Sequence, residues 1–182
     1  MRFAFNERKT AQAAAYLCIR RHGGPKSYMA LLKLLYLADR RSLVETGRPI
    51  TGDRMVSMPH GTVLSRTYDR IASGEDRPST PWSEYVSDPV RYEVEALRED
   101  TDELSTYELR VLDQTHEKFG NLDQWGLREL THGLPEYEDP HGSSITIRPA
   151  DILRATDVPE DEIQRLSREA EAAFRIRQFA DG

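Results

Sequence analysis

The chain has 182 residues, of which 38% are hydrophobic and 31% are charged, and its formal net charge is -6. This length suits one domain that buries a hydrophobic core, and the mixed composition excludes a wholly disordered chain. The acidic balance argues against non-specific nucleic-acid binding, which needs an excess of Lys and Arg to neutralise phosphates.

Cys18 is the single cysteine, so no intrachain disulfide can form and a reducing, cytoplasmic location is expected. The apolar run at residues 13–19 is too short to span a membrane and lacks the order of a signal peptide. No internal repeat or linker divides the chain, so we expect one domain over residues 1–182.

Helix signals begin at Asn6, which can cap a helix over residues 7–21. A second helix is expected from just after Ser27 to residue 45 or 46, because Gly47 stands where a left-handed residue usually ends a helix. Six of the eight residues in the segment 31–38 are apolar. This helix should therefore run through the centre of the domain.

The next segment mixes strand and helix signals. Residues 50–58 carry β-branched side chains beside turn residues, which predicts a short strand or extended segment. A third helix should follow Gly61, with Val63 on its apolar face, and residues 73–81 should form an exposed loop. Residues 92–96 alternate apolar and charged, which predicts a half-buried strand that pairs with residues 50–58.

Two capping signals mark helices in the second half of the chain. Ser105 opens a capping box before a helix over residues 106–119, and Asp123 caps a helix over residues 124–132. Residues 133–144 are rich in turn formers and should form a loop.

Two prolines suit the first turns of the final helices. Pro149 should open a short helix, and Pro159 should open a last one with an apolar stripe at Ile163, Leu166, Ala170 and Phe174. The predicted fold is mainly α, with six to seven helices and a small antiparallel sheet of two or three strands.

No pattern for catalysis or cofactor binding is present. The chain has no nucleophile elbow and no phosphate-binding loop, and Cys18 lies in an apolar stripe that is typical of an inert thiol. His132, Glu136, Glu138, Asp139 and His141 lie within ten residues, but their spacing matches no metal-ligand pattern and acidic loops usually face water. We therefore expect no enzyme activity, no metal and no cofactor.

A polar row on the central helix is a candidate protein-binding face. Lys33, Tyr36 and Arg40 lie at i, i+3 and i+7, and Tyr and Arg are frequent at binding hot spots. Alternatively, Tyr36 packs in the core while the two basic side chains extend past apolar neighbours to water. The predicted partner-binding residues are Lys33, Tyr36, Arg40, Arg54, His60 and Arg66.

Five motifs follow one another in order: Lys-Leu-Leu-Tyr-Leu-Ala-Asp-Arg at 33–40, Gly-Arg-Pro-Ile-Thr-Gly-Asp at 47–53, Met-Pro-His-Gly at 58–61, Leu-Ser-x-x-Glu at 104–108 and Leu-Thr-His-x-Leu-Pro-Glu at 130–136. In this order they resemble the Panacea family of SocA-like antitoxins, over almost the whole chain. The family usually has Pro where this chain has Thr62, and typically Trp where it has Tyr137.

The resemblance implies an antitoxin of a bacterial or phage type II-like toxin–antitoxin system, of the kind linked to phage defence. Such a protein neutralises a toxin, encoded by the adjacent gene, through direct contact. One alternative is a proteolytic adaptor that delivers the toxin to an ATP-dependent protease. A metal-dependent hydrolase and a transcriptional regulator are further alternatives. The sequence favours neither a nucleic-acid nor a membrane partner and leaves self-association open.

Overall fold

The computed structural model describes residues 1–20, 26–72 and 80–180. These residues form eight helices and two small antiparallel sheets, so the predicted mainly α fold with a minor sheet is confirmed. The helices are α1 (Glu7–Ile19), α2 (Tyr28–Thr46), α3 (Ser65–Ala72), α4 (Pro81–Tyr85), α5 (Thr106–Phe119), α6 (Gln124–His132), α7 (Pro149–Ala155) and α8 (Glu160–Ala180). The strands are β1 (Lys26–Ser27), β2 (Met55–Met58), β3 (Gly61–Leu64), β4 (Glu93–Val94) and β5 (Ile145–Thr146).

The predicted capping signals define the helix ends. The Asn6 side chain accepts a hydrogen bond from the first turn of α1, and Asp123 does the same for α6. Ser105 and Glu108 form the reciprocal capping box of α5. Gly47 ends α2 at a φ of 75°, in the left-handed region that glycine adopts without a Cβ clash.

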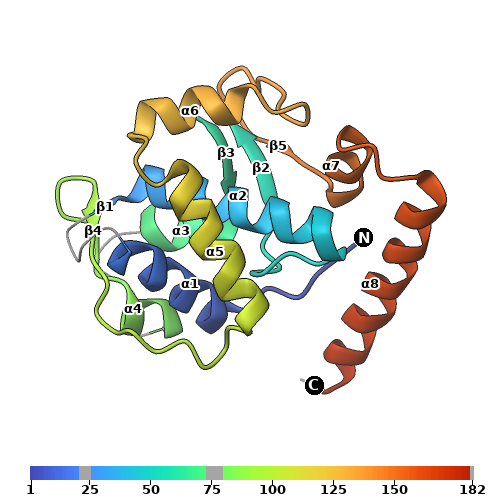
Figure 1. Ribbon diagram of the computed structural model, residues 1–182, viewed down its shortest axis with the longest axis horizontal. Coiled ribbons are helices and arrows are strands. Elements are labelled where there is room, and N and C mark those ends of the chain that lie inside the picture. Colours follow the sequence, from blue (N-terminus) through green and yellow to red (C-terminus); the bar gives the residue numbers. More distant parts are fainter. Residues whose placement is uncertain (21–25, 73–79, 181–182) are drawn as a thin grey trace.

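Helix α2 is the centre of the fold, as its leucine-rich sequence predicts. It runs between α5 and the β2–β3 hairpin and also contacts α1, α6 and α7 (Figure 1). Leu31, Leu34, Leu35 and Leu43 are at most 1% exposed. The surrounding elements are therefore held together by burial of one helix on most of its circumference.

The predicted strand pairing is wrong. Strand β2 is confined to the end of the 50–58 segment, and it pairs with β3 and with β5. Residues 93–94 instead pair with the short strand β1. The β2–β3 hairpin closes over the two-residue loop Pro59–His60, and such a local connection costs less loop entropy than a distant one.

The predicted third helix starts later than expected. Val63 lies in β3, and α3 begins at Ser65, where Asp53 accepts hydrogen bonds from the backbone N–H groups of Arg66 and Thr67. Short runs of apolar residues fit a strand as well as a helix, which explains the error. Of the predicted loop 73–81, residues 73–79 lie outside the described residues, and its end opens α4.

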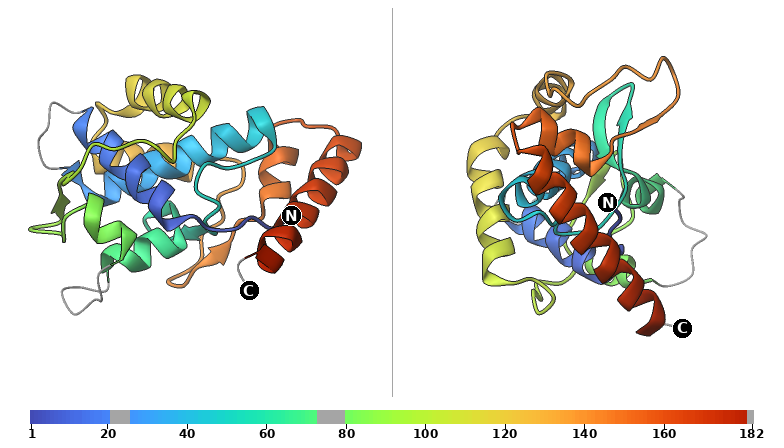
Figure 2. Two further views of the ribbon diagram at one scale, coloured as in Figure 1. Left: turned by 90° about the horizontal axis from the view of Figure 1, so that it is seen from below. Right: turned by 90° about the vertical axis from the view of Figure 1, so that its right-hand side faces the viewer.

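Helix α8 lies along one side of the molecule, next to α7 and the N-terminus (Figure 2). Its predicted stripe is buried at Ile163 and Ala170, whereas Ile176 and Phe179 near its end are 71% and 88% exposed. Arg2 ties the N-terminal segment to α8 by an ion pair with Glu171 at 2.7 Å. None of the described helices combines the length and the apolar character that crossing a membrane requires.

Candidate partner-binding site

A cavity of about 600 Å³ opens at the N-terminal end of α2. Five elements surround it: the first turns of α2, the β2–β3 hairpin, α3, the first turns of α6 and the turn before β4. This volume falls within the range of about 300–1,000 Å³ that is usual for ligand-binding pockets. Its lining includes Tyr28, Lys33, His60, Tyr68, Tyr92, Trp125 and Arg128.

The walls of this cavity, here called the α2 pocket, are joined by specific contacts. The Ser27 hydroxyl donates to the Gln124 side-chain oxygen at 2.9 Å, which links the starts of α2 and α6. The backbone N–H of Tyr28 donates to the carbonyl of Tyr92 at 3.0 Å, and the two rings lie 6.2 Å apart. These contacts hold Tyr92 against the start of the central helix.

Lys33 lies at the floor of the α2 pocket and is 1% exposed. Its ammonium group donates to the backbone carbonyl of His60 in the β2–β3 turn. Gly61 has a φ of 98°, and a Cβ there would lie 2.7 Å from Lys33 Nζ and would also clash with Thr131. The glycine of the Met-Pro-His-Gly motif is therefore needed for both the turn and the approach of the lysine.

The lysine lies near two other basic side chains, Arg128 and His132. Burial, together with the neighbouring Arg128 guanidinium, lowers the pKa of Lys33 to about 8. The pKa of His132 is also lowered, by burial and then by Arg128 and Lys33. Among the residues that the structure describes, no carboxylate forms an ion pair with Lys33. A buried cation without an anionic partner is costly, so this site favours an anion from outside.

Tyr36 and Arg40 meet a buried carboxylate from the last motif. The Tyr36 hydroxyl donates to Glu136 Oε1 at 2.8 Å, and the Arg40 guanidinium donates to both Glu136 oxygens at 2.6 and 3.1 Å. The Glu136 side chain is fully buried and that of Arg40 is 19% exposed. Burial and the Glu136 carboxylate raise the pKa of Tyr36 well above its ordinary value. This triad holds the 133–140 loop on α2.

Two motif aspartates also have internal roles. Asp39 is buried and accepts hydrogen bonds from the backbone N–H groups of Ile50 and Thr51, at 2.9 and 3.0 Å, and from the Thr51 hydroxyl. Asp53 accepts from the backbone of α3 and from the Thr67 hydroxyl at 2.7 Å. Both carboxylates therefore fix the connection between α2 and α3.

The six predicted partner-binding residues fall into three places. Lys33 contacts the His60 carbonyl in the α2 pocket, and Tyr36 and Arg40 share Glu136. Arg54 and Arg66 are exposed, and the backbone N–H of each donates to Asp53. The Arg54 side chain donates to Ser65, and that of Arg66 lies over the Phe5 ring. The structure does not gather the six into one face, since the Lys33 and Tyr36 side chains are buried.

Two other residues that the sequence offered for metal binding or catalysis, His132 and Cys18, pack against other residues of the fold. The His132 ring stacks on Tyr137 at 4.3 Å, and no group of three metal-ligating side chains exists within the described ranges. Cys18 is buried, and burial raises the pKa of its thiol to about 12. A thiol in this setting is not activated as a nucleophile.

Comparison with known families adds the decisive observation. The family model described as antitoxin SocA-like, Panacea domain, matches residues 31–137, which is more than half of the chain. The chain belongs to the Panacea family. No curated protein and no solved structure matches it.

The Panacea segment contains the central helix from Leu31, the β2–β3 hairpin, β4 and α6. It therefore includes most of the α2 pocket and the whole Glu136 triad. Sequence reasoning did not identify Tyr92, Trp125 and Arg128 as pocket residues. One signal was available for Trp125: it lies two residues before buried Leu127, off the apolar stripe of α6, and is 61% exposed.

Proposed function

We propose that this Panacea chain is an antitoxin that neutralises a cognate toxin through direct protein binding in the cytoplasm. The family match over residues 31–137 is the observation that carries this proposal. The toxin is expected to be encoded by the adjacent gene. No catalytic step is proposed.

The use of the motif carboxylates supports a binding role. Asp39 and Asp53 accept hydrogen bonds from the backbone, and Glu136 binds Tyr36 and Arg40. Carboxylates that are fully hydrogen-bonded inside the fold stabilise it and are not positioned as acids or bases for an external substrate. The motifs therefore account for a scaffold, which leaves exposed side chains to contact a partner.

The proposed partner surface keeps the exposed members of the predicted set. Arg40, Arg54, His60 and Arg66 are exposed or half-exposed and can contact a toxin. Lys33 and Tyr36 are buried and support this surface from inside. Lys33 donates to the His60 carbonyl in the β2–β3 turn, and Tyr36 holds the 133–140 loop on α2.

Co-expression tests the function. The adjacent open reading frame is expressed in a bacterial host alone and together with this chain. We expect growth arrest by the partner alone, normal growth on co-expression, and a complex that co-purifies. Equal growth arrest with and without this chain would contradict the antitoxin role.

The same experiment separates direct neutralisation from proteolytic delivery. In a host that lacks its ATP-dependent proteases, direct binding predicts unchanged protection and an unchanged toxin level. Loss of protection in that host, with restoration by the protease gene, would instead indicate the adaptor mechanism.

A further inference from the structure

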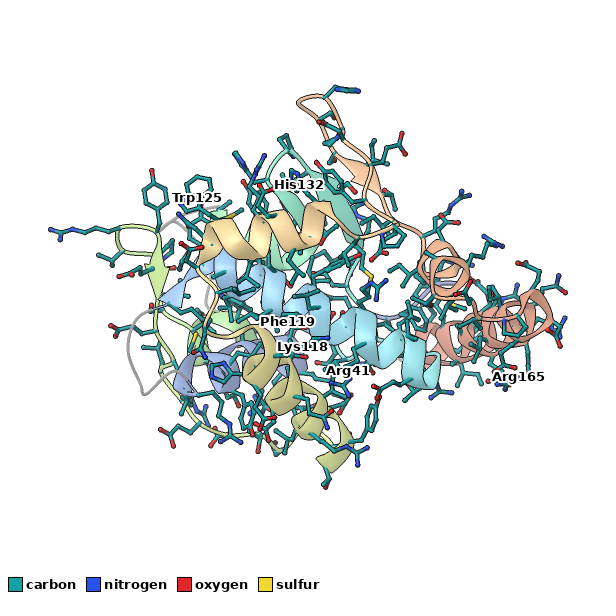
Figure 3. All side chains as sticks on the ribbon, turned by 45° about the horizontal axis from the view of Figure 1, so that its top comes forward. Arg41, Lys118, Phe119, Trp125, His132 and Arg165 are labelled. Carbon is teal, nitrogen blue, oxygen red and sulfur yellow. The ribbon has the colours of Figure 1, made fainter. Side chains whose placement is uncertain are left out.

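The rim of the α2 pocket exposes large aromatic side chains. Tyr92 is 73% exposed and Trp125 is 61% exposed, and both line the pocket. Trp125 lies near the start of α6, and His132 lies at the other end of this helix (Figure 3). Burying such aromatic side chains stabilises a complex strongly, and Tyr, Trp and Arg dominate binding hot spots.

Backbone strain positions one of these aromatics. The turn before β4 is closed by reciprocal hydrogen bonds between Val90 and Glu93, at 2.8 and 3.0 Å. Its two central residues, Arg91 and Tyr92, have φ values of 53° and 68°. Such a turn favours Asn and Gly, and a left-handed conformation costs other residues about 1–2 kcal/mol each. Strain of this kind concentrates at functional sites.

Charge distinguishes the pocket from the rest of the protein. The chain carries a net charge of -6, yet Lys33, Arg91 and Arg128 all line the pocket. The lining also includes Glu93 and Asp123, but Asp123 is engaged with the backbone N–H groups of Trp125 and Gly126. Arg128 pairs with Glu129 at 2.6 Å, so the buried cation at the pocket floor is Lys33, beneath an aromatic rim.

We infer that the α2 pocket docks a toxin segment in which a large apolar side chain, inserted between Tyr92 and Trp125, is followed by a carboxylate that pairs with Lys33 and Arg128. This inference rests on the proposed antitoxin function for the identity of the partner. The pocket itself supplies the chemistry: aromatic walls for the apolar side chain and, for the acid, the buried Lys33 together with Arg128, whose guanidinium also pairs with the exposed Glu129 at 2.6 Å.

Peptide probes test the pocket without a toxin. Acetyl-Phe-Glu-amide is compared with acetyl-Phe-Gln-amide and acetyl-Ala-Glu-amide, with amide NMR shifts of the protein as the readout. We expect the Phe-Glu peptide to bind at least about fivefold more tightly than either control, with shifts at Lys33, Tyr92 and Trp125. Equal affinities, or shifts elsewhere on the protein, would overturn the inference.

Variants test the charge. Lys33→Met should abolish the preference for Glu over Gln, and Arg128→Gln, at a half-exposed position, should reduce it while circular dichroism stays unchanged. If Lys33→Met does not fold, Arg128→Gln decides. An undiminished preference in the folded variant would overturn the role of the cations.

Toxin binding tests the docking role. Trp125→Ala and Tyr92→Ala should each weaken binding of the co-purifying toxin at least about tenfold, whereas Phe179→Ala, an exposed aromatic on α8, should not. Wild-type affinity in both pocket variants would overturn the docking role and leave the antitoxin function intact. If the wild-type chain binds no toxin, the proposed function fails, and the peptide titration alone decides the chemistry of the pocket.

Discussion

The two basic residues of the polar row on α2, Arg40 and Lys33, have opposite surroundings. At one end, Arg40 donates to both oxygens of the buried Glu136, and Tyr36 completes the triad. At the other end, the Lys33 ammonium group donates to the backbone carbonyl of His60 at the floor of an open pocket. The polar row thus has a closed structural ion pair at one end and, at the other, a buried lysine that forms no ion pair with a carboxylate of the described residues.

The Glu136 triad, at the Arg40 end of the row, should have the largest effect on the free energy of unfolding. Glu136→Ala leaves the Arg40 charge and the Tyr36 hydroxyl without their partner in a buried setting, and such a loss typically costs about 3–5 kcal/mol. Urea unfolding followed by circular dichroism measures the change. The matched control Glu162→Ala removes a surface ion pair with Arg165 and should lower stability much less. Equal losses would mean that the Glu136 triad contributes no more than a surface pair.

The turn that covers Lys33 should be the next most sensitive point. Gly61→Ala adds the strain of a left-handed residue and a clash with Lys33 Nζ and Thr131, so we expect a loss of about 3 kcal/mol. Gly142 also has a positive φ, of 94°, but nothing lies within 4 Å of an added Cβ. Gly142→Ala should therefore cost about 1 kcal/mol. A similar thermal stability for the two variants would show that the turn does not pack on the lysine.

Lys33, at the other end of the row, should make the stability of the protein depend on pH. The pKa of Lys33 is lowered to about 8 from 10.5, so between these pH values the unfolded chain binds more protons and stability rises with pH. The unfolding free energy of the wild type minus that of Lys33→Met should therefore increase by about 2–3 kcal/mol as the pH rises through this window.

The groups that face Lys33 in that titration are Arg128 and His132 of α6 and His60 of the β2–β3 turn. Lys118→Met, at an exposed position on α5, is the control and should show no such growth. A difference that is constant with pH would mean that Lys33 titrates like an ordinary lysine.

The smallest predicted effect has the opposite sign. Arg91→Gly relieves a left-handed residue in the turn before β4, so we expect a gain of about 1 kcal/mol in unfolding free energy. The same variant should bind the toxin more weakly, because it loses a cation at the pocket rim. A loss of stability would show that the turn is not strained.

The sequence predicts the helices well because their signals are local. Asn6, Ser105 and Asp123 each bond to the backbone within a few residues, and the leucines of α2 alone predict its central position. Strand partners were not predictable, because the alternation at residues 92–96 shows that one face is buried but does not identify the neighbouring strand.

The site was predicted only in part, for a related reason. Lys33, Tyr36 and Arg40 were identified as a polar row, but their difference depends on Glu136, which is about a hundred residues away in the chain. The pocket likewise depends on Tyr92 and Trp125, which come together with Lys33 only in the folded protein. Long-range contacts of this kind have no periodic signature in the sequence.

The two tryptophans allow a direct test of the proposal that toxin docking covers the Lys33 end of α2. Trp82 is 4% exposed and Trp125 is 61% exposed, so in protein labelled with 5-fluorotryptophan the two 19F resonances report buried and exposed sites separately. On addition of unlabelled toxin, we predict that the Trp125 resonance shifts and loses its solvent-isotope effect while that of Trp82 stays unchanged. A stable complex in which Trp125 remains as exposed to solvent as in the free protein would contradict the claim.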